Sequence, residues 1–423
     1  MERHASKRST DGQGTNVQPP PPKRQRRESS PVIYCHDDCA RHVTTGDGDA
    51  EHQESPARLA AIAAALQNYA WVREFAPASR EALLRVHSAR YLDAVERIDA
   101  RGRLSPMLRT RVLGESGVDG TAGATPVGPG TWTAATRGAG AALAAVRDAT
   151  PGSRAFVLVR PPGHHAMREG YDASAGGCGF CVLGNAAVAA AEALTSEGTR
   201  VAIVDIDVHH GNGTEAWALT KNSERLLYAS VHLREVYPGN SSLDFFPGTG
   251  AASCGCCFVG TSMTQGPDGG VVALPCEQRT TRSAICNVPV LPNWIQEGAR
   301  ERFVAAVDEI SRKLAAFRPS LLIISAGFDA LEGDAGQLNP WTRDDPDLPP
   351  NVAPDVLDGV GLRPEDYGTM TRALMGAIPG DASVVSLLEG GYGRPDGAGG
   401  FEKSGLVAAA VAHVEALELC SRS

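Results

Sequence analysis

Apolar residues along residues 31–423 follow two alternating patterns, one helical and one typical of buried strands. The helical pattern is clearest over residues 300–317, where apolar positions recur every three or four residues: Phe303, Val307, Ile310, Leu314 and Phe317. The strand pattern consists of short runs with almost no polar residue. Such runs predict strands that are buried on both faces, as in a parallel sheet.

These patterns predict a definite order of elements. Helices are expected over residues 57–69, 79–98, 185–197, 300–317 and 365–378, and in a last helix after Phe401. Strands are expected over residues 155–159, 201–206, 226–231, 321–325 and 383–388. The alternation predicts an α/β fold in which a mostly parallel sheet carries helices on both faces.

Four segments follow neither pattern. Residues 1–30 are basic, rich in proline and almost without apolar side chains, which predicts a disordered tail. Residues 101–130, 251–283 and 337–361 are expected to be irregular surface inserts. The rest of residues 31–423 is expected to form one domain.

Composition and charge narrow the class of protein. Of the 423 residues, 42% are hydrophobic and 21% are charged, which excludes wholesale disorder. Residues 1–30 carry seven of the 40 Lys and Arg residues and three of the 49 Asp and Glu residues, so the remainder has a formal charge of −13. An acidic body is a poor general binder of nucleic acid and suits cationic substrates.

The cellular location that we expect depends on two features of the sequence: apolar segments that it lacks and a short run of basic residues. No apolar run reaches the roughly 18 residues of a membrane span, and residues 1–30 lack an apolar signal core, so we expect neither a membrane-spanning nor a secreted protein. The ten cysteines are then expected to be mostly free thiols. The run Lys23–Arg27 predicts a nuclear location shared with the cytoplasm, the alternative being a solvated charged stretch.

Reactive side chains directly follow four of the predicted strands. They lie in the segments Arg160–His165, Asp205–Gly211, Gly327–Asp329 and Glu389–Tyr392. Because ligands of open parallel sheets bind outside the carboxyl ends of the strands, we expect these segments to form a single site.

Two of the segments offer metal ligands. Asp205, Asp207 and His209 alternate along the chain, so an extended backbone places their side chains on one side. Asp207 and His209 with Asp329 would give a divalent metal three ligands and leave a position open, as in a catalytic zinc site. Capping of the next helix would explain one such residue, but not reactive residues at four strand ends.

His164 and His165 are candidates for acid-base chemistry beside that metal. Amide hydrolysis needs a base for the attacking water and an acid for the leaving amine. The rigid Arg160–Gly163 turn places the two histidines directly after a buried strand, although adjacent histidines also occur idly on surfaces. Tyr392 on its Gly-Gly turn could donate its hydroxyl to a developing oxyanion.

The segment Cys178–Cys181 is a C-x-x-C, which in isolation is typical of zinc or redox sites. The cysteines 254, 256 and 257 lie in a low-complexity insert, so no structural zinc site is expected. Phe180 and Phe246 each lie in a Gly-rich turn and could wall a narrow channel, but two core aromatics would fit equally well.

Together these segments resemble the zinc-dependent histone deacetylase family, which has the arginase–deacetylase fold. The motifs are RPPGHHA at 160–166, GFC at 179–181, DIDVHHGNGT at 205–214, FFPGTG at 245–250, SAGFDA at 325–330 and LEGGY at 388–392. They follow the order of the family, and the resemblance covers residues 31–419. LEGGY, and Asn212 where many members carry Asp, resemble the class II branch.

The resemblance implies roles for the residues of the metal centre. The zinc ligands of the family match Asp207, His209 and Asp329. His165 matches the general base, which Asn212 would orient, and His164 matches the neighbouring histidine, which Asp205 would support. A structural potassium site in relatives matches Asp205, Asp207, His209 and Ser230.

The resemblance also implies the substrate contacts. Tyr392 matches the residue that polarises the substrate carbonyl. The acetyl-lysine tunnel matches Gly179, Phe180, Phe246 and Gly391. The His-Pro-Glu pattern of the family reads here as His52–Pro56, and residues 119–125 do not place the acidic lip residue that grips the substrate backbone.

The function implied is hydrolysis of acetyl-lysine in histones or other proteins, in corepressor-type complexes and without a membrane or sequence-specific nucleic acid. One alternative is an acetylpolyamine amidohydrolase, whose gatekeeping glutamate would correspond to Gly336, with Glu332 and Asp334 nearby. A catalytically silent binding module would normally lack a ligand or Tyr392. A binuclear manganese ureohydrolase would need further carboxylates after His209.

Overall fold

The computed structural model describes most of the chain outside the tail and the inserts. The described residues are 30–45, 51–100, 125–170, 178–234, 282–339, 341–344, 348, 350 and 352–418, with the backbone alone of 263–265 and 271–273. The expected tail up to residue 29, Phe246, and most of the expected inserts over 101–130 and 251–283 lie outside the described residues.

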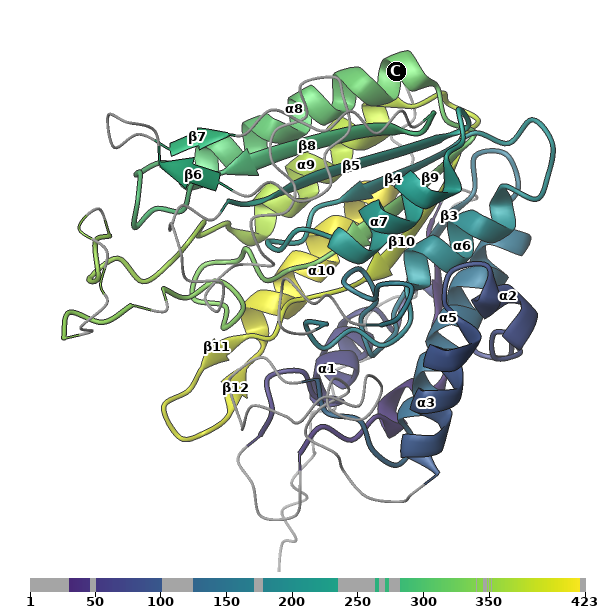
Figure 1. Ribbon diagram of the computed structural model, residues 1–423, viewed down its shortest axis with the longest axis horizontal. Helices are drawn as coiled ribbons and strands as arrows, with labels where there is room; N and C mark the ends of the chain where they lie inside the picture. The colour runs from purple at the N-terminus through teal and green to yellow at the C-terminus, as the bar shows by residue number, and fades with distance from the viewer. Residues whose placement is uncertain are drawn as a thin grey trace, which may run out of the picture.

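A single eight-stranded sheet forms the centre of the molecule (Figure 1). Its strand order is β2-β1-β3-β10-β9-β4-β5-β8, and every neighbouring pair is parallel. The bounds are β1 Val32–Tyr34, β2 Ala70–Val72, β3 Arg154–Val157, β4 Val201–Asp205, β5 Leu226–Leu233, β8 Ala284–Val290, β9 Leu321–Ala326 and β10 Ser383–Leu388. The predicted parallel α/β architecture is confirmed.

Helices cover both faces of this sheet. One group packs together as α5 Thr131–Arg147, α6 Asn185–Ala193 and α7 Asn212–Lys221, and the other as α8 Ala299–Phe317, α9 Pro364–Ala377 and α10 Ser404–Leu417. Shorter elements are the 3₁₀ helix η1 Asp37–Arg41 and the helices α1 Ala57–Ala65, α2 Arg80–Leu84 and α3 Ala89–Asp99. Two antiparallel pairs complete the described elements: β6 Met263–Gln265 with β7 Val271–Ala273, and β11 Arg394–Pro395 with β12 Phe401–Glu402.

The structure corrects several predicted elements. The helix predicted over 57–69 ends at Ala65, and a short strand follows. The helix predicted over 79–98 is divided in two, because Ser79 and Ser88 each cap a new helix with the side-chain oxygen. Helix α5 is absent from the prediction, since its sequence is mostly Ala, Gly and Thr and shows no strong apolar period.

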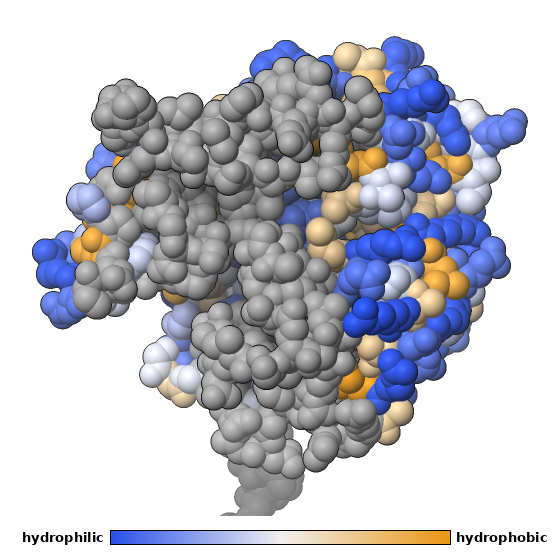
Figure 2. Space-filling view, in the orientation of Figure 1, coloured by the Kyte–Doolittle hydropathy of each residue, from blue (hydrophilic) through white to orange (hydrophobic). Residues whose placement is uncertain are grey.

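The described core is continuous and the described surface is mostly polar. Strands β3, β4, β5, β9 and β10 are buried at every position, as their apolar runs predict. The region 337–361 is only partly a surface insert, because Gln337, Trp341 and Val360 are buried. On the face in Figure 2 apolar residues are scattered among hydrophilic ones. No helix in the described part of the chain is long and apolar enough to span a bilayer.

A buried histidine joins α9, α10 and β10. His413 is fully buried, with Nδ1 2.6 Å from Thr371 Oγ1 and Nε2 2.7 Å from Ser386 Oγ. The Thr371 hydroxyl donates to the carbonyl of Tyr367 at 2.7 Å, so Nδ1–H must be the donor to Thr371 and Nε2 the acceptor from Ser386. Burial favours this neutral ring and lowers the pKa of His413 to about 3.

We predict that the protein loses stability in mild acid and that His413 causes part of the loss. A histidine in the unfolded chain titrates near pH 6.5, so the unfolded state takes up the proton first. The stabilisation is therefore complete above pH 6.5 and is lost as the pH falls toward 3, by about 2 kcal/mol at pH 5. Urea unfolding at pH 7.5 and pH 5 should show a decrease in unfolding free energy that is about 2 kcal/mol smaller in His413→Gln. An equal decrease in both proteins would contradict the prediction.

Candidate active site

The four reactive segments meet because their strands are neighbours. Strands β3, β10, β9 and β4 lie side by side in the sheet, and their carboxyl ends therefore open on one edge. The chain leaves β3 toward His164, β4 toward Asp207, β9 toward Asp329 and β10 toward Tyr392. The expected convergence of the four strand ends is what the structure shows.

Three side chains at this edge can hold a divalent metal. One ligand atom from each of Asp207, His209 and Asp329 lies within 4.8 Å of the others. His209 Nδ1 is 3.0 Å from Asp207 Oδ1 and 3.1 Å from Asp329 Oδ2. Both carboxylates are fully buried. Two carboxylates and one imidazole are donors that suit a catalytic divalent ion with an open position.

The electrostatics of this group reflect two buried acids beside one base. Burial alone would lower the pKa of His209, but hydrogen bonds to Asp207 and Asp329 raise it to about 9. Burial and the charge of Asp207 raise the pKa of Asp329. A divalent cation would replace the proton on His209 as the positive charge that these carboxylates require.

The two adjacent histidines lie in opposite environments. Asp205 Oδ2 lies 2.9 Å from Nδ1 of His164, and Asn212 Oδ1 lies 2.8 Å from Nδ1 of His165. Burial alone would lower the pKa of both histidines. For His164 the charges of Asp207 and Asp205 outweigh burial and raise the pKa well above its usual value. For His165 the charges of His164 and His209 add to burial and lower it.

The two rings therefore differ in their hydrogen-bond partners and in the direction of their pKa shifts. With Nδ1–H of His165 donating to Asn212, the nitrogen left to accept a proton is Nε2. A neutral imidazole beside a charged one is a typical arrangement of a base with an electrostatic partner. The expected partners Asp205 and Asn212 are thus in place.

Tyr392 is buried and keeps its proton. Its ring lies under the guanidinium of Arg58, with Cζ 4.9 Å from the ring centroid, and edge-on to Phe180 at 5.6 Å between centroids. Burial and the charge of Asp329 raise the pKa of the Tyr392 hydroxyl. A hydroxyl that stays protonated can act as a hydrogen-bond donor.

The expected tunnel residues are described in part. Phe180 has φ 65°, an unusual backbone conformation for a non-glycine residue, and its N–H donates to Thr125 Oγ1 at 2.9 Å. Its ring also contacts His52 edge-on, at 4.9 Å between centroids. Gly179 precedes it with φ 47°, and Gly391 precedes Tyr392 with φ 103°. The position of Phe246 is outside the described residues.

From the sequence, no function was assigned to a network of buried charged side chains next to the site. Glu54 accepts two hydrogen bonds from Arg160, at 2.7 and 2.8 Å, and one from Arg58 at 3.1 Å, and all three side chains are fully buried. Burial would raise the pKa of Glu54, but Arg160 lowers it to about 2. Arg58 also donates to the carbonyls of Glu389 and Gly391, next to Tyr392. The only signal in the sequence was the altered His-Pro-Glu pattern at residues 52–56.

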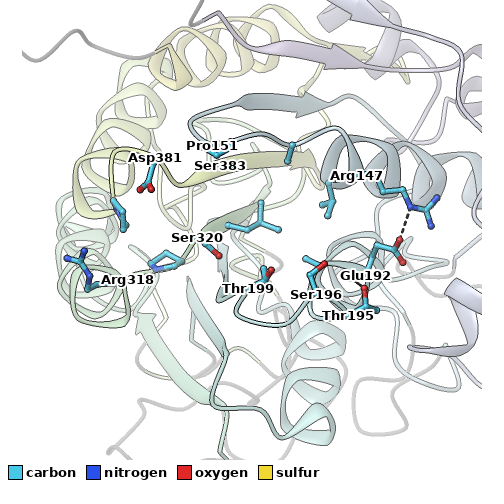
Figure 3. Close-up of a pocket in the computed structure, with 16 residues that line it drawn as sticks. Arg147, Pro151, Glu192, Thr195, Ser196, Thr199, Arg318, Ser320, Asp381 and Ser383 are labelled. Atoms are coloured by element: carbon cyan, nitrogen blue, oxygen red, sulfur yellow. Dashed lines mark hydrogen bonds and ion pairs between the residues drawn. The ribbon is translucent and has the colours of Figure 1, made fainter.

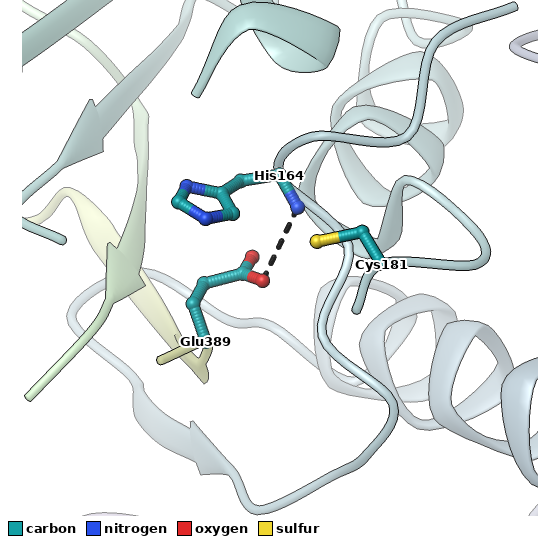
Figure 4. Close-up of side chains that lie close together, drawn as sticks. All are labelled: His164, Cys181 and Glu389. Atoms are coloured by element: carbon teal, nitrogen blue, oxygen red, sulfur yellow. Dashed lines mark hydrogen bonds between the residues drawn. The ribbon is translucent and has the colours of Figure 1, made fainter. Parts of the chain in front are cut away.

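A second group of possible metal ligands is better explained by hydrogen bonding (Figure 4). His164, Cys181 and Glu389 have ligand atoms within 4.8 Å of one another. Glu389 Oε2, however, accepts the N–H groups of Gly163 at 2.7 Å and His164 at 3.2 Å. Burial raises the pKa of Glu389 to about 7 and that of the Cys181 thiol well above its usual value. The group therefore fixes the turn that carries the two histidines.

A cavity of about 720 Å³ lies at the opposite edge of the sheet (Figure 3). Its lining includes Ser320 and Ser383, beside the amino ends of β9 and β10, and the pair Arg147 and Glu192. Figure 3 shows Arg318 and Asp381 at the other end of the lining. The cavity is therefore separate from the candidate site.

Comparisons with known proteins agree with this geometry. Residues 52–403 match the histone deacetylase domain. The chain is 32% identical to a histone deacetylase-like amidohydrolase of Pseudomonas aeruginosa, over 82% of this chain and 73% of that protein. It is 28% identical to an acetylpolyamine amidohydrolase of Mycoplana ramosa, over 81% of this chain and 88% of that protein. The crystal structure of the HDA15 HD domain matches with a TM-score of 0.63 and 26% identity, over 92% of this chain and 89% of that one.

We predict that the chain binds one divalent ion and that Asp329→Ala removes it, because two remaining ligands cannot hold a catalytic metal. Metal analysis after dialysis against buffered Zn²⁺ measures the stoichiometry. Asp381→Asn, at the opposite edge of the sheet, is the matched control and should keep one equivalent. One equivalent of metal in Asp329→Ala would contradict the assignment of this ligand.

Proposed function

The chain belongs to the histone deacetylase family, with relatives in its class II branch, and on this premise we propose that it hydrolyses the acetyl amide of acetyl-lysine with zinc. The observation that carries the proposal is the position of two adjacent histidines, one paired with Asp205 and the other with Asn212, beside a three-ligand group. In this proposal the zinc ligands are Asp207, His209 and Asp329.

The proposed chemistry divides the reaction among the described side chains. Zinc, when bound, would supply Lewis acidity and lower the pKa of water. His165 takes the proton of the attacking water at Nε2 and returns it to the leaving lysine amine. His164, paired with Asp205, stabilises negative charge, and Tyr392 donates its hydroxyl to the carbonyl oxygen of the substrate.

The substrate we favour is a protein, histones included, because none of the carboxylates described in residues 330–339 is poised to bind a second amine. A Cβ at Gly336 would lie 2.6 Å from Asp329 Cβ and 3.0 Å from Tyr392 Cε2, so this position has no room for a gatekeeping side chain. The carboxylate of Glu332 already faces a cation of this chain, since its Oε1 lies 3.8 Å from Nη2 of Arg394. Asp334 is buried and accepts hydrogen bonds from backbone N–H groups.

Of the two alternatives, one keeps specific support and the other does not. The Mycoplana relative is named for acetylpolyamine hydrolysis, so a small cationic substrate is the second candidate. A silent binding module on the same fold would be expected to lack part of the catalytic group, whereas Asp207, His209, Asp329 and Tyr392 all lie at the same edge of the sheet.

Location, partners and the second cation remain proposals on sequence grounds. The run Lys23–Arg27 supports a nuclear location shared with the cytoplasm. Corepressor-type complexes follow from the resemblance alone, and the acidic body argues against binding to a specific nucleic acid sequence. A potassium ion near Asp205 and Ser230 is proposed on the same resemblance.

We predict that acetyl-lysine peptides are better substrates than acetylated polyamines. Without a fixed partner for the second ammonium, a polyamine gains no ion pair, and one ion pair of about 1.4 kcal/mol corresponds to tenfold in affinity. Competition kinetics should give a higher kcat/KM for peptides, because the polyamine lacks this roughly tenfold advantage. Glu332→Gln is the matched control and should leave the ratio unchanged. A clear preference for acetylated polyamine over several peptides would contradict the proposed substrate.

A further inference from the structure

Asp334 lies directly behind the turn that carries Tyr392. Its carboxylate is buried, with 1% of the residue exposed, and accepts three backbone N–H groups. Oδ2 accepts from Tyr392 at 2.9 Å and from Gly393 at 2.7 Å, and Oδ1 accepts from Gly336 at 2.9 Å. One side chain thus ties the segment after β9 to the segment after β10.

The turn is shaped so that two successive N–H groups reach this one oxygen. Gly393 has φ 96°, and a Cβ at this position would lie 2.3 Å from the carbonyl oxygen of Glu402. The carbonyl of Gly393 in return accepts the N–H of Ala335 at 3.0 Å. The two segments therefore exchange hydrogen bonds in both directions: Asp334 accepts from the Tyr392 turn, and the neighbouring Ala335 donates to it.

The other anchors of the turn act at different groups. Arg58 donates to the carbonyls of Glu389 and Gly391 and lies over the Tyr392 ring. The N–H of Phe328 donates to the carbonyl of Gly390 at 3.1 Å. Within the described residues, the N–H of Tyr392 itself is bound by Asp334.

We propose that Asp334 is a positioning residue for the hydroxyl of Tyr392. By holding the N–H groups of Tyr392 and Gly393, it fixes the backbone that carries the phenol ring. The ring borders the same small space as Asp329, since a Cβ at Gly336 would lie 3.0 Å from Tyr392 Cε2 and 2.6 Å from Asp329 Cβ. An oxyanion donor is effective only in the right place, since a misplacement of about 1 Å can reduce turnover about a hundredfold. The inference rests on the proposed function, in which Tyr392 donates to the substrate carbonyl.

The test is a double-mutant cycle in kcat with the zinc-loaded full chain and an acetyl-lysine peptide. Asp334→Asn replaces one acceptor oxygen by a donor, so it cannot bind the N–H groups on both sides. We expect kcat to fall by about tenfold to a hundredfold while KM stays within about twofold. On the background of Tyr392→Phe, which lacks the hydroxyl, Asp334→Asn should cause no further loss.

The matched control is Asp358→Asn. Asp358 Oδ1 accepts from the N–H of Gly333 at 2.7 Å and from Gln337 Nε2 at 2.9 Å, so it binds the same segment without touching the Tyr392 turn. Its kcat should stay near that of the wild type. Zinc content and thermal unfolding report whether each variant is folded, and Asp334→Glu, which displaces the carboxylate, replaces Asp334→Asn if the latter does not fold.

The outcomes separate the inference from the proposed function. An unchanged kcat in Asp334→Asn, or an equal loss with and without the Tyr392 hydroxyl, would overturn the positioning role alone. An unchanged kcat in Tyr392→Phe would overturn the proposed function and the inference with it.

Discussion

Two carboxylates buried side by side are the constraint on which the rest of the site depends. Asp207 and Asp329 are fully buried and both lie within hydrogen-bonding distance of one imidazole nitrogen. Uncompensated charges in such a place are strongly unfavourable. The backbone offsets part of this cost, because Gly390 N–H donates to Asp207 and Val208 N–H donates to Asp329. A divalent cation is the simplest source of the remaining positive charge.

The groups around this centre give each catalytic candidate a fixed state. Against the effect of burial, the charges of Asp207 and Asp205 raise the pKa of His164, and the charge of His164 adds to burial in lowering the pKa of His165. Tyr392 is held from both sides of its turn, by Arg58 at the carbonyls and by Asp334 at the N–H groups. In the proposed function, residues that do not contact the substrate thus position the side chains that do contact it.

Local sequence patterns predicted five of the eight strands of the sheet and the convergence of four strand ends, but not strands β1, β2 and β8 or the residues that hold the site together. Buried parallel strands leave continuous apolar runs, and reactive residues after four such runs indicate a shared edge. Asp334 and Arg58 act on a turn at residues 389–393, and a contact between segments so far apart leaves no local period. Helix α5 was not predicted for a related reason. Its small residues allow close packing against neighbouring segments, and they do not form an amphipathic stripe.

The central claim is that this edge of the sheet performs metal-dependent amide hydrolysis. The most direct measurement is acetate release from an acetyl-lysine peptide by chelator-treated protein during stepwise addition of Zn²⁺. The account predicts no turnover without metal and a linear increase that ends at one zinc per chain. Full turnover by protein that holds far less than one metal ion per chain would contradict it.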